Sequence, residues 1–158
     1  GRHRGDLFIS LHFNSVQSGA DRTTGVEVFT MTPQFQFSTS DPAHEDVAEA
    51  KKSNPGNKFD HWNTVLGYSM HREMLRALKA SDRGLKRARL KVLLLAPCPA
   101  VLVESGYLSH DTEARKIATP AHRQKIAEAI AGGVLAYAAT LDAMRPERQS
   151  APAGPASR

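Results

Sequence analysis

A short apolar run that ends in a single carboxylate constrains the fold of this chain more than any other stretch. Residues 100–103 are all apolar, Glu104 follows at once, and Ser105-Gly106 then interrupts the run. A continuous run of Val and Leu is typical of a strand buried on both faces, as in a sheet flanked by helices. An unpaired buried carboxylate is costly, so Glu104 should face a pocket, a cation or water. The alternative is that it only caps the next helix or meets a surface arginine.

A second apolar run ends in a similar way, at His12 and Asn14. Neutral imidazole is the commonest metal ligand among protein side chains. Ligands bind at the carboxyl ends of strands in open α/β sheets. The two runs therefore suggest that His12 and Glu104 share one edge of one sheet. On periodicity alone, however, a histidine at the end of a strand is more often a hydrogen-bonded structural residue.

The composition is that of one ordinary globular domain of 158 residues, long enough to bury a core. No apolar segment is expected to approach the roughly 18–20 residues of a membrane span. The net charge of +5 favours anionic partners, namely nucleic acid, membrane surfaces or acidic envelope polymers. The densest basic cluster, residues 83–89, has no interleaved aromatic side chain for stacking on bases. We interpret that cluster as a solvated loop rather than a nucleic-acid site.

The only cysteine, Cys98, excludes an intrachain disulfide and a cysteine-based zinc site. It is expected to be a buried small hydrophobic residue. The other patterns predict two further strands and three helices, with Asp82-Arg-Gly84 ending the first helix. The strands are expected at 25–31 and 90–95, and the helices at 63–79, 109–118 (capped by Ser109 or Asp111) and from Thr119-Pro120 to about 141.

Residues 32–60 form a long irregular region with one short helix expected at 43–51, begun by Ser40-Asp41-Pro42. A lid beside the site and a floppy surface insertion are the two alternatives for a connection of this length. Residues 145–158 are rich in Pro, Ala and Ser and are expected to be a disordered tail. The sum is a single α/β domain over residues 1–144.

Four sequence blocks, taken in order, resemble the zinc-dependent N-acetylmuramoyl-L-alanine amidases, a family of cell-wall hydrolases. The blocks are residues 6–14, 25–29, 82–93 and 99–109. The resemblance covers Asp6 to about Leu141. It implies one α/β catalytic unit with a mixed, mostly parallel sheet and helices on both faces. The first strands and helices of that unit are missing from this chain.

The resemblance also implies roles for individual residues. The family binds zinc through His, Glu and His, and a further Glu is the catalytic acid and base. His12 matches the last zinc-binding histidine, and Glu104 matches the catalytic glutamate. The other two ligands would precede Gly1, and no Gly-His-Gly sequence occurs in the chain. Zinc binding and activity are therefore expected to depend on a longer protein.

The implied reaction is hydrolysis of the amide bond between N-acetylmuramic acid and L-alanine in peptidoglycan. The implied cofactor is Zn²⁺, the implied location is periplasmic or extracellular, and the insertion at 32–60 would be the target of an activator protein. One alternative is another zinc amidohydrolase or peptidase. A second is a non-catalytic wall-binding remnant in which His12 and Glu104 are structural. A third, a basic nucleic-acid-binding domain, would show salt-dependent DNA affinity.

Overall fold

The computed structural model describes residues 5–40 and 46–144, which contain one mixed sheet of four strands. Across the sheet the strands are β1 (Phe8–Asn14), β4 (Ala100–Tyr107), β2 (Val26–Met31) and β3 (Asp82–Ala88). The β1–β4 and β2–β3 pairs are parallel, and the β2–β4 pair is antiparallel. The predicted mixed, mostly parallel sheet of an α/β domain is confirmed.

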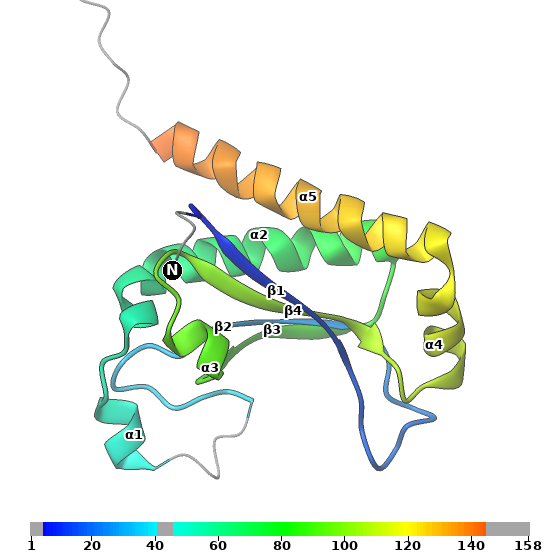
Figure 1. Cartoon of the computed structure of the whole chain (residues 1–158), viewed down its shortest axis with the longest axis horizontal. Coiled ribbons are helices and arrows are strands. Elements are labelled where there is room, and N and C mark those ends of the chain that lie inside the picture. Colours follow the sequence, from blue (N-terminus) through cyan, green and yellow to red (C-terminus); the bar gives the residue numbers. More distant parts are fainter. Residues whose placement is uncertain (1–4, 41–45, 145–158) are drawn as a thin grey trace, which may run out of the picture.

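Helices cover both faces of this sheet. Two long helices, α2 (Asp60–Leu78) and α5 (Pro120–Met144), lie side by side on one face (Figure 1). The short helix α3 (Lys91–Leu94) lies on the other face, and α4 (Asp111–Ala118) joins β4 to α5. The predicted α2, α4 and α5 are confirmed, with α2 beginning three residues earlier than expected.

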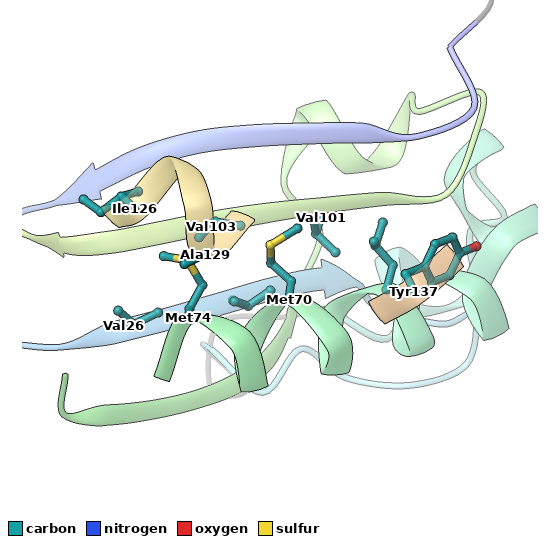
Figure 2. Close-up of a cluster of buried hydrophobic side chains, with 10 residues drawn as sticks. Val26, Met70, Met74, Val101, Val103, Ile126, Ala129 and Tyr137 are labelled. Atoms are coloured by element: carbon teal, nitrogen blue, oxygen red, sulfur yellow. The ribbon is translucent and has the colours of Figure 1, made fainter. Parts of the chain in front are cut away.

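Side chains alternate along the strands and so divide the core into two parts. Val101 and Val103 of β4 pack with Met70 of α2 and Ala129 of α5 (Figure 2). On the other face, Ala100 and Leu102 of β4 and Met31 of β2 pack on Leu93 of α3. β4 is therefore buried on both faces, as its continuous apolar run predicts.

Two predictions around residues 82–95 are wrong. Residues 82–88 form strand β3 rather than a helix end and a solvated loop, and residues 91–94 form α3 rather than a strand. Helix α2 instead ends at Lys79, which adopts the left-handed conformation with φ 52°. β3 lies at an edge of the sheet and has mostly polar side chains, so it lacks the apolar run by which a strand is recognised.

β4 is longer than the sequence predicts, because it continues through Ser105 and Gly106 to Tyr107. Gly106 has a φ of 140°, which is open to glycine but not to most residues. The β1–β4 register shifts at this place, between His12 and Asn14. Glu104 therefore lies inside the strand, and the interruption at Ser105-Gly106 is a bulge rather than the strand end.

The described part of residues 32–60 is fastened to β3 and its C-terminal flank. The Arg89 guanidinium donates to the carbonyl oxygens of Pro33 and Gln36 at 3.2 and 2.9 Å. Thr39 N donates to the carbonyl of Arg87 at 3.0 Å. The region contains α1 (Val47–Lys51) and the 3₁₀ helix η2 (Pro55–Phe59).

The caps of two helices differ from those predicted. Helix α1 is capped by Asp46 rather than begun at residues 40–42. For α4 the cap is His110, whose Nδ1 accepts from Glu113 N at 3.3 Å, rather than Ser109 or Asp111. Residues 41–45 and the expected tail at 145–158 lie outside the described residues.

The prediction that no apolar segment is long enough to span a membrane is wrong for α5. This helix has 25 residues and is long and apolar enough to cross a membrane by the criteria of length and composition alone. Alanine and glycine residues lie all around this helix, outside the apolar stripe, and they make the whole segment apolar. In the fold its residues Ile126, Ala129 and Tyr137 pack into the core shared with α2 (Figure 2).

Candidate active site

Three adjacent strands bring His12, Glu104 and Glu27 together. His12 is paired with Glu104 between β1 and β4, and Glu104 is paired with Glu27 between β4 and β2. Paired residues on neighbouring strands point to the same face of a sheet. Val103 and Val28 face α2 and α5. Their neighbours in sequence, Glu104 and Glu27, therefore lie on the opposite face of the sheet, and so does His12, which is paired with Glu104.

Glu27 is the most enclosed group of this site, with only 2% of its surface exposed. Its Oε1 accepts from Asn14 Nδ2 at 2.6 Å and from the Tyr107 hydroxyl at 2.7 Å. Its Oε2 forms an ion pair with Lys86 Nζ. Asn14, Tyr107 and Lys86 come from β1, β4 and β3, so the Glu27 carboxylate is bonded to all three of the other strands.

These contacts decide the charge of Glu27. Burial raises the pKa of its carboxyl, but the hydrogen bonds from Lys86 and Tyr107, the charge of Lys86 and the bond from Asn14 outweigh that penalty, so its pKa lies below the ordinary value. Glu27 is therefore ionised at neutral pH.

Glu104 has the opposite environment. Its Oε2 is buried and has no hydrogen-bond partner among the described residues. Burial, together with the negative charge of Glu27, raises the pKa of Glu104 to about 7. A carboxyl group with this pKa is suited to take up and release a proton at neutral pH. That Glu104 faces a pocket, a cation or water stays a prediction; its Oε2 meets no arginine among the described residues.

His12 lies beside Glu104 and is exposed. Its Nε2 is 2.9 Å from Ser10 Oγ on the same strand, so this nitrogen has one weakly held hydroxyl partner. The structure thus places the two residues predicted to share a site on paired positions of adjacent strands.

The described residues alone do not form a complete metal site. No group of three or more His, Cys, Asp or Glu side chains within residues 5–40 and 46–144 is arranged to hold a metal ion. A catalytic zinc requires three protein ligands, so the described residues do not supply a full set.

Sequence reasoning did not find Glu27, Tyr107 or Lys86. A signal for Glu27 was present, because it is a charged residue between Val26 and Val28, both on the buried face of a strand. An ionised residue within a fully buried strand requires polar partners on neighbouring strands. Lys86 gave no such signal, since β3 was not predicted as a strand.

The mixed four-stranded sheet with helices on both faces is an α/β domain that matches solved amidase catalytic domains. Its sequence matches the profile of the N-acetylmuramoyl-L-alanine amidase family over residues 1–136. The chain belongs to this family, whose named members are hydrolases.

Individual relatives agree with this assignment. The chain is 30% identical over 136 residues to an uncharacterized cell wall amidase of Bacillus anthracis, covering 86% of this chain and 22% of that protein. It is 28% identical over 155 residues to the N-acetylmuramoyl-L-alanine amidase AmiA of Escherichia coli, covering 86% and 53%. The chain thus spans about half the length of AmiA and about a fifth of the Bacillus anthracis protein.

Solved structures show the same fold. The amidase AmiC2 of Nostoc punctiforme superposes with a TM-score of 0.62 at 25% identity, covering 85% of this chain and 58% of that one. The CwlD amidase of Clostridioides difficile, in complex with the GerS lipoprotein, gives a TM-score of 0.63 at 20% identity, covering 88% and 57%. The second likeness concerns the fold alone.

Proposed function

We propose that the protein containing this chain hydrolyses the amide bond between N-acetylmuramic acid and L-alanine in peptidoglycan, with Glu104 as the catalytic acid and base. The observation that carries the proposal is the unpaired, buried Oε2 of Glu104 beside His12. Family membership supplies the substrate class.

In this reaction the Glu104 carboxylate accepts a proton from the attacking water and passes a proton to the leaving amine. Glu27 remains ionised. Its bonds to Asn14 and Tyr107 hold together the ends of β1 and β4, the two strands that carry His12 and Glu104. Its negative charge favours the protonated form of Glu104. Glu27 is thus a positioning residue, and Glu104 performs the proton transfer.

We further propose that the reaction depends on zinc and that His12 is one of the zinc ligands. A bound zinc would activate the water and polarise the amide carbonyl. The remaining ligands would come from parts of the longer protein that this sequence does not contain. The basis is the exposed His12 imidazole paired with Glu104, together with the greater length of the relatives.

The test uses the longest natural protein that contains this chain, with purified peptidoglycan as substrate. Glu104→Gln should lower the rate of stem-peptide release by about 100-fold or more, while the bound zinc stays unchanged. His12→Ala should lower zinc content and activity together. Glu128→Gln is the matched control, because Glu128 is exposed and accepts a hydrogen bond from Gln124 on the surface of α5.

Three outcomes would favour the alternatives. A Glu104→Gln variant within about twofold of the wild-type rate removes Glu104 from the mechanism. Cleavage only within the stem peptide would indicate a peptidase. Sedimentation with the cell wall but no hydrolysis by the zinc-loaded protein would indicate a wall-binding role.

Peptidoglycan as substrate implies a place in the cell envelope, periplasmic or extracellular, and we propose that location for this protein. We also propose that a partner protein acts on residues 32–60, where Phe35 is 73% exposed and Phe37 is 46% exposed. Replacing both with Ser leaves the anchoring bonds of Arg89 intact. Activation by a cognate partner should then be lost while basal activity is kept; retained activation would contradict the proposal.

A further inference from the structure

A concave feature lies away from the carboxylate pair, where the end of α2, the end of α4 and the start of α5 meet. It is a hollow of about 580 Å³. Five basic residues line it, and no Asp or Glu does. They are Lys79 from the C-terminus of α2, Arg115 and Lys116 from α4, and His122 and Lys125 from α5. We call this feature the basic hollow.

The cations of the basic hollow are not neutralised within the described residues. No ion pair joins Lys79, Lys116 or Lys125 to a carboxylate there, and Arg115 bonds only to the Thr112 hydroxyl, at 3.3 Å. The carboxylate that acts most directly on the hollow is Glu113, and its oxygens are occupied by the backbone N–H groups of Gly25 and Tyr107.

The end of α4 and the start of α5 explain only part of this arrangement. Arg115 and Lys116 occupy the last turn of α4, where cations are favourable. His122 instead lies in the first turn of α5, where a positive charge is unfavourable and where there is no acidic residue, and Lys125 follows in the next turn. The fold therefore concentrates positive charge at a place where a helix end adds to it.

His122 responds to this charge. Burial lowers its pKa, and the charges of Lys116 and Lys125 lower it further, against a smaller opposing effect of Glu113. The imidazole thus experiences a net positive potential within the hollow.

We propose that the basic hollow binds a linear polyanion whose charges are phosphodiester groups separated by polyol units. Lysine ammonium groups bind phosphate as point charges, and Thr112 and Thr119 add hydroxyl groups at the wall. The volume of about 580 Å³ lies in the range of pockets that bind a small-molecule ligand.

Features of the lining favour a polyol phosphate over other phosphodiesters. No Trp, Tyr or Phe lines the hollow, so nucleic-acid bases would have no stacking surface. Its apolar lining, Ala77, Leu78 and Ala121, lies within a concave surface rather than protruding to insert among lipid chains. A flexible phosphate chain fits both observations. Such binding would hold the protein on an anionic polymer independently of the carboxylate pair.

The test is calorimetric titration of the protein with a short glycerol phosphate polymer at physiological ionic strength. Lys116→Glu/Lys125→Glu should lower the affinity by about tenfold or more, since it places two negative charges inside the hollow. Lys58→Glu/Lys91→Glu is the matched control, with the same change in net charge on exposed residues of η2 and α3. The control should stay within about threefold of wild type.

Three arms keep the proposal falsifiable. Saturable binding by wild type, lost only in the hollow variant, supports it; no saturable binding, or equal loss in the control variant, overturns it. If single-stranded DNA, or vesicles of phosphatidylglycerol and phosphatidylcholine, bind more tightly than the glycerol phosphate polymer, the proposal is overturned, and the tighter-binding probe identifies the source of the phosphodiesters. Should the hollow variant fail to fold, NMR titration of His122 in the wild-type protein decides. Bound polymer should raise the pKa of His122, and an unchanged titration curve contradicts binding there.

Discussion

Two carboxylates on neighbouring strands have pKa values shifted in opposite directions, and their hydrogen-bond partners account for the difference. Glu27 has three polar partners from three strands, one of which, Lys86, forms an ion pair with it, so its charge is retained despite full burial. Glu104 has an unpaired buried oxygen and a neighbouring negative charge. Environments that move two pKa values apart are typical of acid and base assignments in active sites.

The environment of Glu104 should make stability depend on pH. Its pKa is 4.5 in an unstructured chain and about 7 in the fold, so the fold favours the protonated form. The stability that this group contributes is fully present below pH 4.5 and is lost as the pH rises through 7, by up to about 1.4 kcal/mol per pH unit within that window.

Glu104→Gln removes the ionisable group and should therefore be as stable as wild type near pH 4.5 but more stable above pH 7. The measurement is urea unfolding across this pH range in metal-free buffer, with Glu128→Gln as the control. If the curves of wild type and Glu104→Gln run parallel, the carboxyl of Glu104 is not held in its protonated form by the fold.

Removal of Glu27 should be among the most destabilising single changes in this chain. Glu27→Ala leaves Lys86 without its counter-ion and removes the acceptor of Asn14 and Tyr107. Breaking one side of a buried ion pair costs about 3–5 kcal/mol. Glu27→Gln keeps an acceptor oxygen and should cost less. Urea unfolding measures both, and Glu128→Ala should change stability by less than about 0.5 kcal/mol; a loss that small for Glu27→Ala would exclude a positioning role.

At the scale of elements, the two long helices pack closely because one of two adjacent glycines in α5 faces α2. A Cβ atom on Gly133 would lie 2.8 Å from Met70 Sδ and 2.9 Å from Met70 Cα. A Cβ atom on Gly132 would meet only Glu73, at 3.4 Å from the flexible Oε2. The contact between α2 and α5 therefore depends on Gly133 and not on Gly132.

These two glycines should respond to alanine with opposite signs. Gly133→Ala should destabilise by about 1–3 kcal/mol, because the backbone of α2 must move away. Gly132→Ala should stabilise by up to about 1 kcal/mol, since alanine is the better helix former. Thermal unfolding of both variants measures this difference. Equal shifts of the same sign would mean that α5 is free to move relative to α2.

How much of these elements could be predicted depends on burial. The apolar run before Glu104 predicted β4, and the apolar stripe of residues 63–79 predicted α2, because both elements bury long apolar surfaces. β3 could not be predicted, since it is an edge strand with mostly polar side chains, and its backbone is paired on the outer side by Thr39, whose Oγ1 accepts from Arg87 N. The pairing of His12 and Glu104 was predictable from two similar runs. Glu27 had a local signal as a charged residue between two buried valines, but its place beside Glu104 depended on an antiparallel pairing of β2 with β4, which no local pattern reveals.

At the scale of the whole molecule, the sheet has one edge that the described helices leave open. β1 is an outer strand of the sheet, paired only with β4 among the described strands. Figure 1 shows β1 on the outside of the sheet, beyond β4. Leu11 on this strand is 51% exposed and Phe8 is 36% exposed. An edge strand with unpaired backbone groups and exposed apolar side chains is a template for pairing with another chain.

The 158-residue chain should therefore self-associate through β1 in a concentration-dependent manner. Leu11→Lys should shift the equilibrium toward the monomer, because a lysine on an edge strand opposes strand pairing between copies. Leu95→Lys is the matched control, since Leu95 is 61% exposed at the end of α3. Sedimentation velocity over a range of concentrations measures the change. A monomeric wild-type chain at high concentration, or equal effects of the two lysines, would show that β1 is not the associating surface. If only Leu11→Lys suppresses the association, β1, the strand on which His12 lies, is the strand through which copies of the chain associate.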